Sequence, residues 1–184
     1  MSKRKNSNAF IASMNFAAHS MNYKKIIKHL SFSLFFIIFM AGCGAVVSQQ
    51  GEKLPIQGQT HIKPGEEAME YNSNPPTSGA HLSSAANWGI SRGPVPDVQA
   101  IHNLEHGGIW ISYKNLDEES LQKLRDFANK HYESVLLSPR EANDSKIAIA
   151  AWGYLEQINT LDMEVLENFY KANKNKSPEP IAGK

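Results

Sequence analysis

The segment GIWISY, residues 108–113, decides the fold prediction, because it carries β-branched and aromatic residues on both faces of an extended chain. Such a segment is typical of a central strand that is buried on both sides. Two further apolar segments, residues 135–138 and 146–154, indicate strands, and the turn-forming residues 143–145 precede the second of them. The sequence therefore predicts a small sheet with GIWISY at its centre.

Two amphipathic helices are predicted around these strands. Residues 115–131 and residues 162–173 both repeat apolar side chains at the spacing of one helix face. The order of elements is then strand, helix, two strands and helix, which predicts an α+β domain. We expect a small, mainly antiparallel sheet of three to four strands with both helices on one face, preceded by a loop-rich segment.

That loop-rich segment is residues 61–97, which is divided by Pro64-Gly65, Pro75-Pro76 and Gly93-Pro94. Pairs of this kind fix turns and prevent long helices. A long run without regular structure inside a compact domain usually carries function.

A pair of histidines lies between the loop-rich segment and the central strand. Asp97 is a suitable N-cap and Gly107 a suitable C-terminal residue for a short helix. On such a helix His102 and His106 are four residues apart, with about 5–6 Å between their Cβ atoms, so both can bind one metal ion. If the segment is a strand instead, the two lie about 13 Å apart and cannot share a metal.

His81 is the predicted third ligand, because the prolines before it make its loop stiff. Three imidazoles with an open position suit copper or zinc, and Glu105 or His61 can complete or orient the shell. Taken alone, His61 has the character of a surface residue. The alternative is that these histidines only form hydrogen bonds within a non-catalytic structural lipoprotein of the cell envelope.

A metal-dependent hydrolase is a second alternative. His102 to His106 reads H-x-x-E-H, a pattern in which both histidines bind zinc and the glutamate, here Glu105, is the catalytic base. The pattern is short, and Gly107-Gly108 ends the predicted helix at the second histidine.

The N-terminal part has the features of an export signal. Lys24, Lys25 and Lys28 precede the apolar residues 30–41, which are too few to span a bilayer that needs roughly 20 but suit a signal peptide. The sequence around Cys43 resembles a lipobox, in which the cysteine is acylated. We therefore expect an extracytoplasmic domain that a lipid on Cys43 anchors to the membrane.

Charge and domain boundaries follow from this division. Of the 19 Lys and Arg, 13 follow Cys43 together with all 18 Asp and Glu, so this part carries a net charge of −5. Such a balance argues against nucleic acid as a partner. We predict a signal peptide at 1–43, a flexible tether at 44–60, a single globular domain at 61–178 and a tail at 179–184.

Three sequence motifs also resemble a bacterial family of unknown function whose members are exported or membrane-anchored. These are YNSNPPTSGAH at 71–81, HNLEHG at 102–107 and AWG at 151–153, and the family is marked by PPTSG-x-H and H-x-LEHG. The resemblance extends over about residues 61–180 and implies no particular reaction. It implies export and one site that contains His81, His102, Glu105 and His106.

Overall fold

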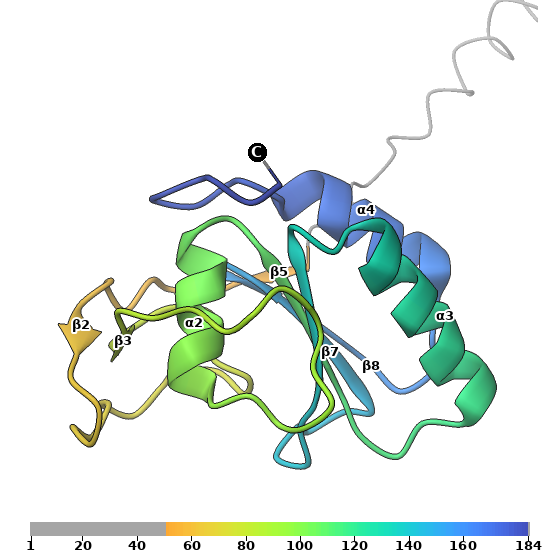
Figure 1. Cartoon of the computed structure of the whole chain (residues 1–184), viewed down its shortest axis with the longest axis horizontal. Coiled ribbons are helices and arrows are strands. Elements are labelled where there is room, and N and C mark those ends of the chain that lie inside the picture. Colours follow the sequence, from red (N-terminus) through yellow and green to blue (C-terminus); the bar gives the residue numbers. More distant parts are fainter. Residues whose placement is uncertain (1–50, 184) are drawn as a thin grey trace, which may run out of the picture. The chain divides into compact units, whose positions relative to one another are not determined.

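The computed structural model describes residues 51–183, which contain two sheets and three helices (Figure 1). The strands are β1 (Glu52–Lys53), β2 (His61–Ile62), β3 (His81–Leu82), β4 (Gly89–Ile90), β5 (Ile109–Tyr113), β6 (Val135–Pro139), β7 (Ile147–Ala151) and β8 (Tyr154–Ile158). The helices are α2 (Asp97–Glu105), α3 (Glu118–Lys130) and α4 (Met163–Asn173). Six strands form the main sheet in the order β1-β8-β7-β5-β6-β4, and β2 and β3 form the second.

The expected small antiparallel sheet with two helices is wrong, because the main sheet has six strands and is mixed. β5 and β6 are parallel, since α3 crosses between them and returns the chain to the same end of the sheet. β7 pairs antiparallel with both β5 and β8. The apolar run at 146–154 does not form one long strand, because Trp152 and Gly153 make a tight turn from β7 into β8, with Gly153 at a φ of +74°.

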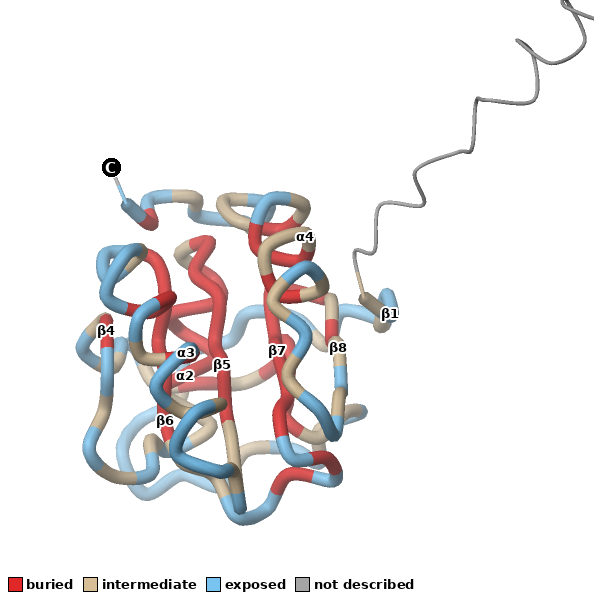
Figure 2. The backbone as a smooth tube through the Cα atoms, turned by 90° about the vertical axis from the view of Figure 1, so that its right-hand side faces the viewer, coloured by how far each residue is buried: buried red, intermediate tan, exposed pale blue. Residues whose placement is uncertain are grey.

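Helices cover both faces of the main sheet (Figure 1). On one face, α3 and α4 pack through Leu124, Phe127 and Phe169 against alternate residues of the central strands. On the other face, α2 packs through Ile101 and Leu104 against the intervening residues. The central strands are therefore buried along most of their length, as Figure 2 shows, and GIWISY is central as expected.

The helical alternative for the paired histidines is confirmed. α2 extends over Asp97–Glu105, with Pro96 rather than Asp97 at the N-cap position. Gly107 follows the helix at a φ of +84°, a conformation that glycine adopts without strain.

The loop-rich segment is largely part of the packed domain. Residues 75–79 are buried, although they form no regular element. β1 falls within residues 44–60, the stretch interpreted as a tether, and pairs with β8. In the predicted tail, the backbone N–H groups of Glu179 and Ala182 donate to the carbonyls of Glu105 and His106 at the end of α2.

The predicted signal peptide and Cys43 lie outside the described residues. Within residues 51–183, none of the helices is both long and apolar enough to cross a bilayer.

Candidate metal centre

Three histidines and one glutamate come together beside α2. One nitrogen or oxygen from each of His61, His81, His102 and Glu105 lies within 4.8 Å of the others. Glu105 Oε2 is central to the group, at 3.0 Å from His81 Nε2, 3.3 Å from His61 Nε2 and 3.8 Å from His102 Nδ1. We call these four residues the His₃Glu cluster.

The second sheet brings two of these histidines together. In the parallel pair β2–β3, His61 is the direct partner of His81, although the two are 20 residues apart. The ring centroids of His61, His81 and His102 are separated by 4.8, 5.2 and 5.3 Å, so the rings surround a common point.

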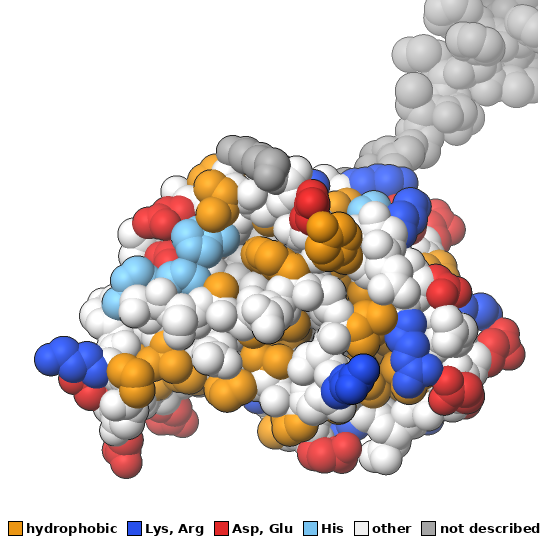
Figure 3. Space-filling model, viewed as in Figure 1, with side chains coloured by type: hydrophobic (Ala, Val, Ile, Leu, Met, Phe, Trp, Pro, Cys, Tyr) orange, Lys and Arg blue, Asp and Glu red, His pale blue; other side chains and the backbone are white. Residues whose placement is uncertain are grey.

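The cluster is buried on all sides but one. The side chains of His81, Glu105 and His102 are 0%, 1% and 9% exposed, whereas that of His61 is 45% exposed. A pale-blue patch of histidines lies on the side of the molecule where α2 and β2 lie (Figure 3). Solvent therefore reaches the cluster past His61.

His81 is held in one orientation by the loop before it. Its Nδ1 lies 2.8 Å from the carbonyl oxygen of Gly79, and the Tyr71 hydroxyl donates to the carbonyl of Ala80 at 2.6 Å. Gly79 has a φ of +116°, and a Cβ there would lie 3.1 Å from the Tyr71 ring. The PPTSG segment thus serves to aim the His81 ring.

α2 presents His102 and Glu105 and is anchored at its first residue. The Arg140 guanidinium binds both carboxylate oxygens of Asp97, at 2.8 and 2.7 Å, and also donates to Asn74 Oδ1 at 2.6 Å. Such a two-point ion pair fixes geometry better than a single contact does. Arg140 therefore holds α2 and the loop that precedes His81 together.

Burial and hydrogen bonding shift the pKa of two cluster residues. Burial raises the pKa of the Glu105 carboxyl, but the hydrogen bonds from His81 and His61 outweigh it, so the pKa lies below its ordinary value. Burial, followed by the neighbouring His106, lowers the pKa of His102. Glu105 is thus an anion and His102 a neutral imidazole near pH 7, which are the protonation states that a metal requires.

His106 lies next to the cluster rather than within the group of four. Its Nε2 is 2.9 Å from His102 Nε2, and its Nδ1 is 3.4 Å from the carbonyl oxygen of Glu179. The structure thus brings His81, His102 and Glu105 together as expected, and it places His61, which the sequence offered as a residue that could complete or orient the shell, directly beside them. The sequence left open whether His61 takes part, because its position depends on the β2–β3 pairing.

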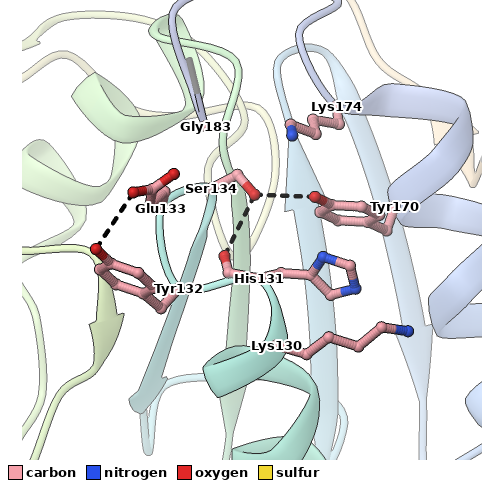
Figure 4. A pocket seen from close by; sticks show the side chains of 8 residues that line it. All are labelled: Lys130, His131, Tyr132, Glu133, Ser134, Tyr170, Lys174 and Gly183. Carbon is pink, nitrogen blue, oxygen red and sulfur yellow. Dashed lines mark hydrogen bonds between the residues drawn. The ribbon is translucent and has the colours of Figure 1, made fainter.

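The two described cavities lie apart from the cluster. One, of about 280 Å³, is shown in Figure 4 and is lined by Lys130, His131, Tyr132, Glu133, Ser134, Tyr170, Lys174 and Gly183. Its hydroxyls are already paired, Ser134 with Tyr170 at 2.9 Å and Tyr132 with Glu133 at 3.2 Å. The other, of about 390 Å³, lies beside β4 and has no charged side chain in its lining. Neither groups residues for chemistry as the cluster does.

Comparison with curated proteins gave no match, and comparison with solved structures gave none. Residues 61–184 match a family model described as "Protein of unknown function (DUF3105)". This match contains both the β2–β3 pair and α2, and with them the whole His₃Glu cluster. Because it covers more than half of the chain, the chain belongs to this family of uncharacterised function, as the sequence motifs led us to expect.

Proposed function

We propose that the domain binds one transition metal ion, copper or zinc, through His61, His81, His102 and Glu105. The separations around Glu105 Oε2 carry the proposal. Four ligands at 2.0–2.1 Å from a tetrahedral zinc ion lie about 3.3 Å from one another. The Glu105 oxygen lies 3.0, 3.3 and 3.8 Å from the three histidine nitrogens, and all four atoms lie within 4.8 Å of one another, so side-chain movements that close the longer separations would bring all four to bonding distance.

The unequal exposure of the ligands indicates how such an ion is exchanged. His81, His102 and Glu105 are buried and form a preorganised set of three ligands, whereas His61 is open to solvent on the short strand β2. Rigid ligands lose little entropy when they bind. We infer that the ion enters and leaves on the His61 side, which suits metal handling better than a permanently enclosed structural ion.

Metal titration tests this proposal. The full chain, purified without a histidine tag, is expected to bind one equivalent of zinc or copper in competition with a chromophoric chelator. His61→Ala should weaken binding about 100-fold or more, since a direct ligand matters more than its outer partners, which are worth about 10–100-fold. His61 is half exposed, so this variant should fold normally. His131→Gln, a histidine outside the cluster, is the matched control.

A chain that binds neither metal, or a His61→Ala variant that binds like the control, contradicts the proposal. That result would favour the alternative of a structural lipoprotein in which the histidines only join the loop to α2.

The hydrolase alternative makes a different prediction for Glu105. If Glu105 is a free catalytic base, Glu105→Gln abolishes turnover and leaves the metal content unchanged. If Glu105 is a ligand, the same variant loses metal. We favour the ligand role, because three imidazoles already surround its carboxylate and only 1% of its side chain is exposed.

We also propose that the domain acts outside the cytoplasm, anchored to the membrane by a lipid on Cys43. The basic residues, the apolar segment 30–41 and the lipobox-like Ala41-Gly42-Cys43 support this. Cells given radioactive palmitate should label the wild-type chain and leave Cys43→Ser unlabelled. Equal labelling of both chains would contradict the anchor.

A further inference from the structure

The orientation of His102 follows from a chain of hydrogen bonds that begins outside the His₃Glu cluster. His106 Nδ1 faces two acceptors of Glu179, the carbonyl oxygen at 3.4 Å and Oε2 at 3.6 Å. A carbonyl oxygen can only accept a hydrogen bond, so Nδ1 is the donor in this contact and the protonated nitrogen of His106. With its proton on Nδ1, the imidazole of His106 presents Nε2 as an acceptor.

This acceptor decides the tautomer of His102. His102 Nε2 lies 2.9 Å from His106 Nε2, and one of these two atoms must donate. Since His106 Nε2 is bare, His102 Nε2 carries the proton and His102 Nδ1 is left with a lone pair. That Nδ1 is buried, has no hydrogen-bond partner among the described residues, and lies 3.8 Å from Glu105 Oε2.

A buried lone pair that faces a carboxylate oxygen is unfavourable unless a cation lies between them. In His81, Nδ1 donates to the Gly79 carbonyl at 2.8 Å, whereas Nε2 lies 3.0 Å from Glu105 Oε2, within the cluster. For His81, however, the available nitrogen is Nε2 and not Nδ1.

We propose, on the basis of the metal site proposed above, that His106 is a positioning residue and not a ligand. It fixes His102 in the tautomer that binds the metal through Nδ1, while His61 and His81 bind through Nε2. The C-terminal residues help to hold His106 in place. The backbone carbonyl of Glu179 accepts a hydrogen bond from His106 Nδ1, and the N–H groups of Ile181 and Ala182 both donate to the His106 carbonyl. An ordinary H-x-x-E-H site would use both histidines as ligands instead.

Nuclear magnetic resonance of the zinc-loaded full chain with ¹⁵N-labelled histidine tests this assignment. Long-range ¹H–¹⁵N correlations identify which ring nitrogen binds zinc and which carries a proton. We expect zinc on Nδ1 of His102 and on Nε2 of His61 and His81, with a protonated Nδ1 and no bound zinc on His106. Zinc on Nε2 of His102, or on His106, would overturn the assignment.

Two variants separate positioning from a merely structural role. His106→Gln keeps an acceptor for His102 and should retain the Nδ1-bound tautomer and near-normal affinity. His106→Leu removes the acceptor and should weaken zinc binding about 10–100-fold and broaden or shift the His102 signals. Equal affinities and spectra for the Leu and Gln variants would overturn the positioning role.

The outcomes also separate this inference from the proposed function. If zinc changes none of the histidine signals, the metal site itself is refuted and the inference with it. If zinc shifts the signals of His61 and His81 but binds His102 through Nε2, the metal site stands and only the role of His106 is refuted.

Discussion

The two faces of the main sheet are built by different means. On the α3–α4 face, two regular helices cover the sheet with apolar side chains, and the fully buried Phe169 and Leu124 are typical of it. On the α2 face, one short helix and several irregular segments cover a smaller apolar cluster and add polar contacts such as Arg140–Asp97 and Asn103–Ala86. Both faces bury apolar side chains, but the second also positions the titratable side chains that carry the proposed function.

The largest effect is expected on the apolar face. Phe169→Ala removes a fully buried ring from α4 and should lower the free energy of unfolding by about 3–5 kcal/mol. Urea unfolding followed by circular dichroism measures this, with the 71% exposed Met69 changed to Ala as the control. The folded fraction of Phe169→Ala should still bind one metal ion. Loss of metal with little loss of stability would contradict this division between the faces.

A change within the cluster should affect metal binding more than the stability of the metal-free chain. His81→Ala removes a buried ligand, so metal affinity should fall about 100-fold or more. Metal at 100 times its dissociation constant stabilises the wild-type chain by about 2.7 kcal/mol, and this gain should fall to about 0.4 kcal/mol or less in the variant. Thermal unfolding with and without zinc provides the measurement. An equal zinc-induced increase in Tm in both chains would exclude His81 as a ligand.

Acid should weaken metal binding through the imidazoles rather than through Glu105. The lowered pKa of Glu105 keeps its carboxylate ionised well below pH 7, whereas an imidazole must be free of its metal-facing proton to bind a metal, so protons compete with the metal for the histidines. Affinity should therefore be highest at pH 7.5 and fall as pH decreases. Competition titrations at pH 7.5, 6.5 and 5.5 check the sign. Affinity that is constant over this range would argue against imidazole ligands.

The smallest effect concerns His131, the histidine of the apolar face. Its ring packs against Phe127 and Tyr170, and burial, followed by Lys130, lowers its pKa. Near pH 6.5 the unfolded chain therefore binds a proton at His131 more readily than the folded protein does. The free energy of unfolding should decrease for this reason as pH falls. His131→Gln should show a shallower loss of stability between pH 7.5 and 5.5 than wild type. Identical slopes in urea unfolding would contradict this.

The longer helices and strands of the domain were predictable, because the spacing of their apolar residues shows which side of each element is buried. The stripes of α3 and α4 and the apolar residues of β5 lie where the sequence placed them. α3 begins at Glu118 with Asp117 as its cap, slightly later than expected, since Asn115 adopts a φ of +48°. The two-residue strands β1 to β4 were missed, because two residues cannot show a period.

The cluster was predictable only in part, for a related reason. His102 and Glu105 lie on the same helix, so their spacing in the sequence determines how close their side chains lie. His81 was included because prolines stiffen its loop. His61 was expected either to complete or orient the shell or to be a surface residue, because its place beside His81 depends on a strand pairing that tertiary packing alone determines. The tail contacts of His106 are non-local in the same way.

X-ray absorption at the zinc edge of the loaded, tagless full chain tests the central claim most directly. The account predicts one zinc ion with four nitrogen or oxygen ligands at about 2.0–2.1 Å and outer-shell scattering from three imidazoles. It also predicts that His61→Ala reduces this scattering to two imidazoles, while His106→Gln leaves it at three. A shell without imidazole scattering, or one that loses an imidazole in His106→Gln and none in His61→Ala, would contradict the account.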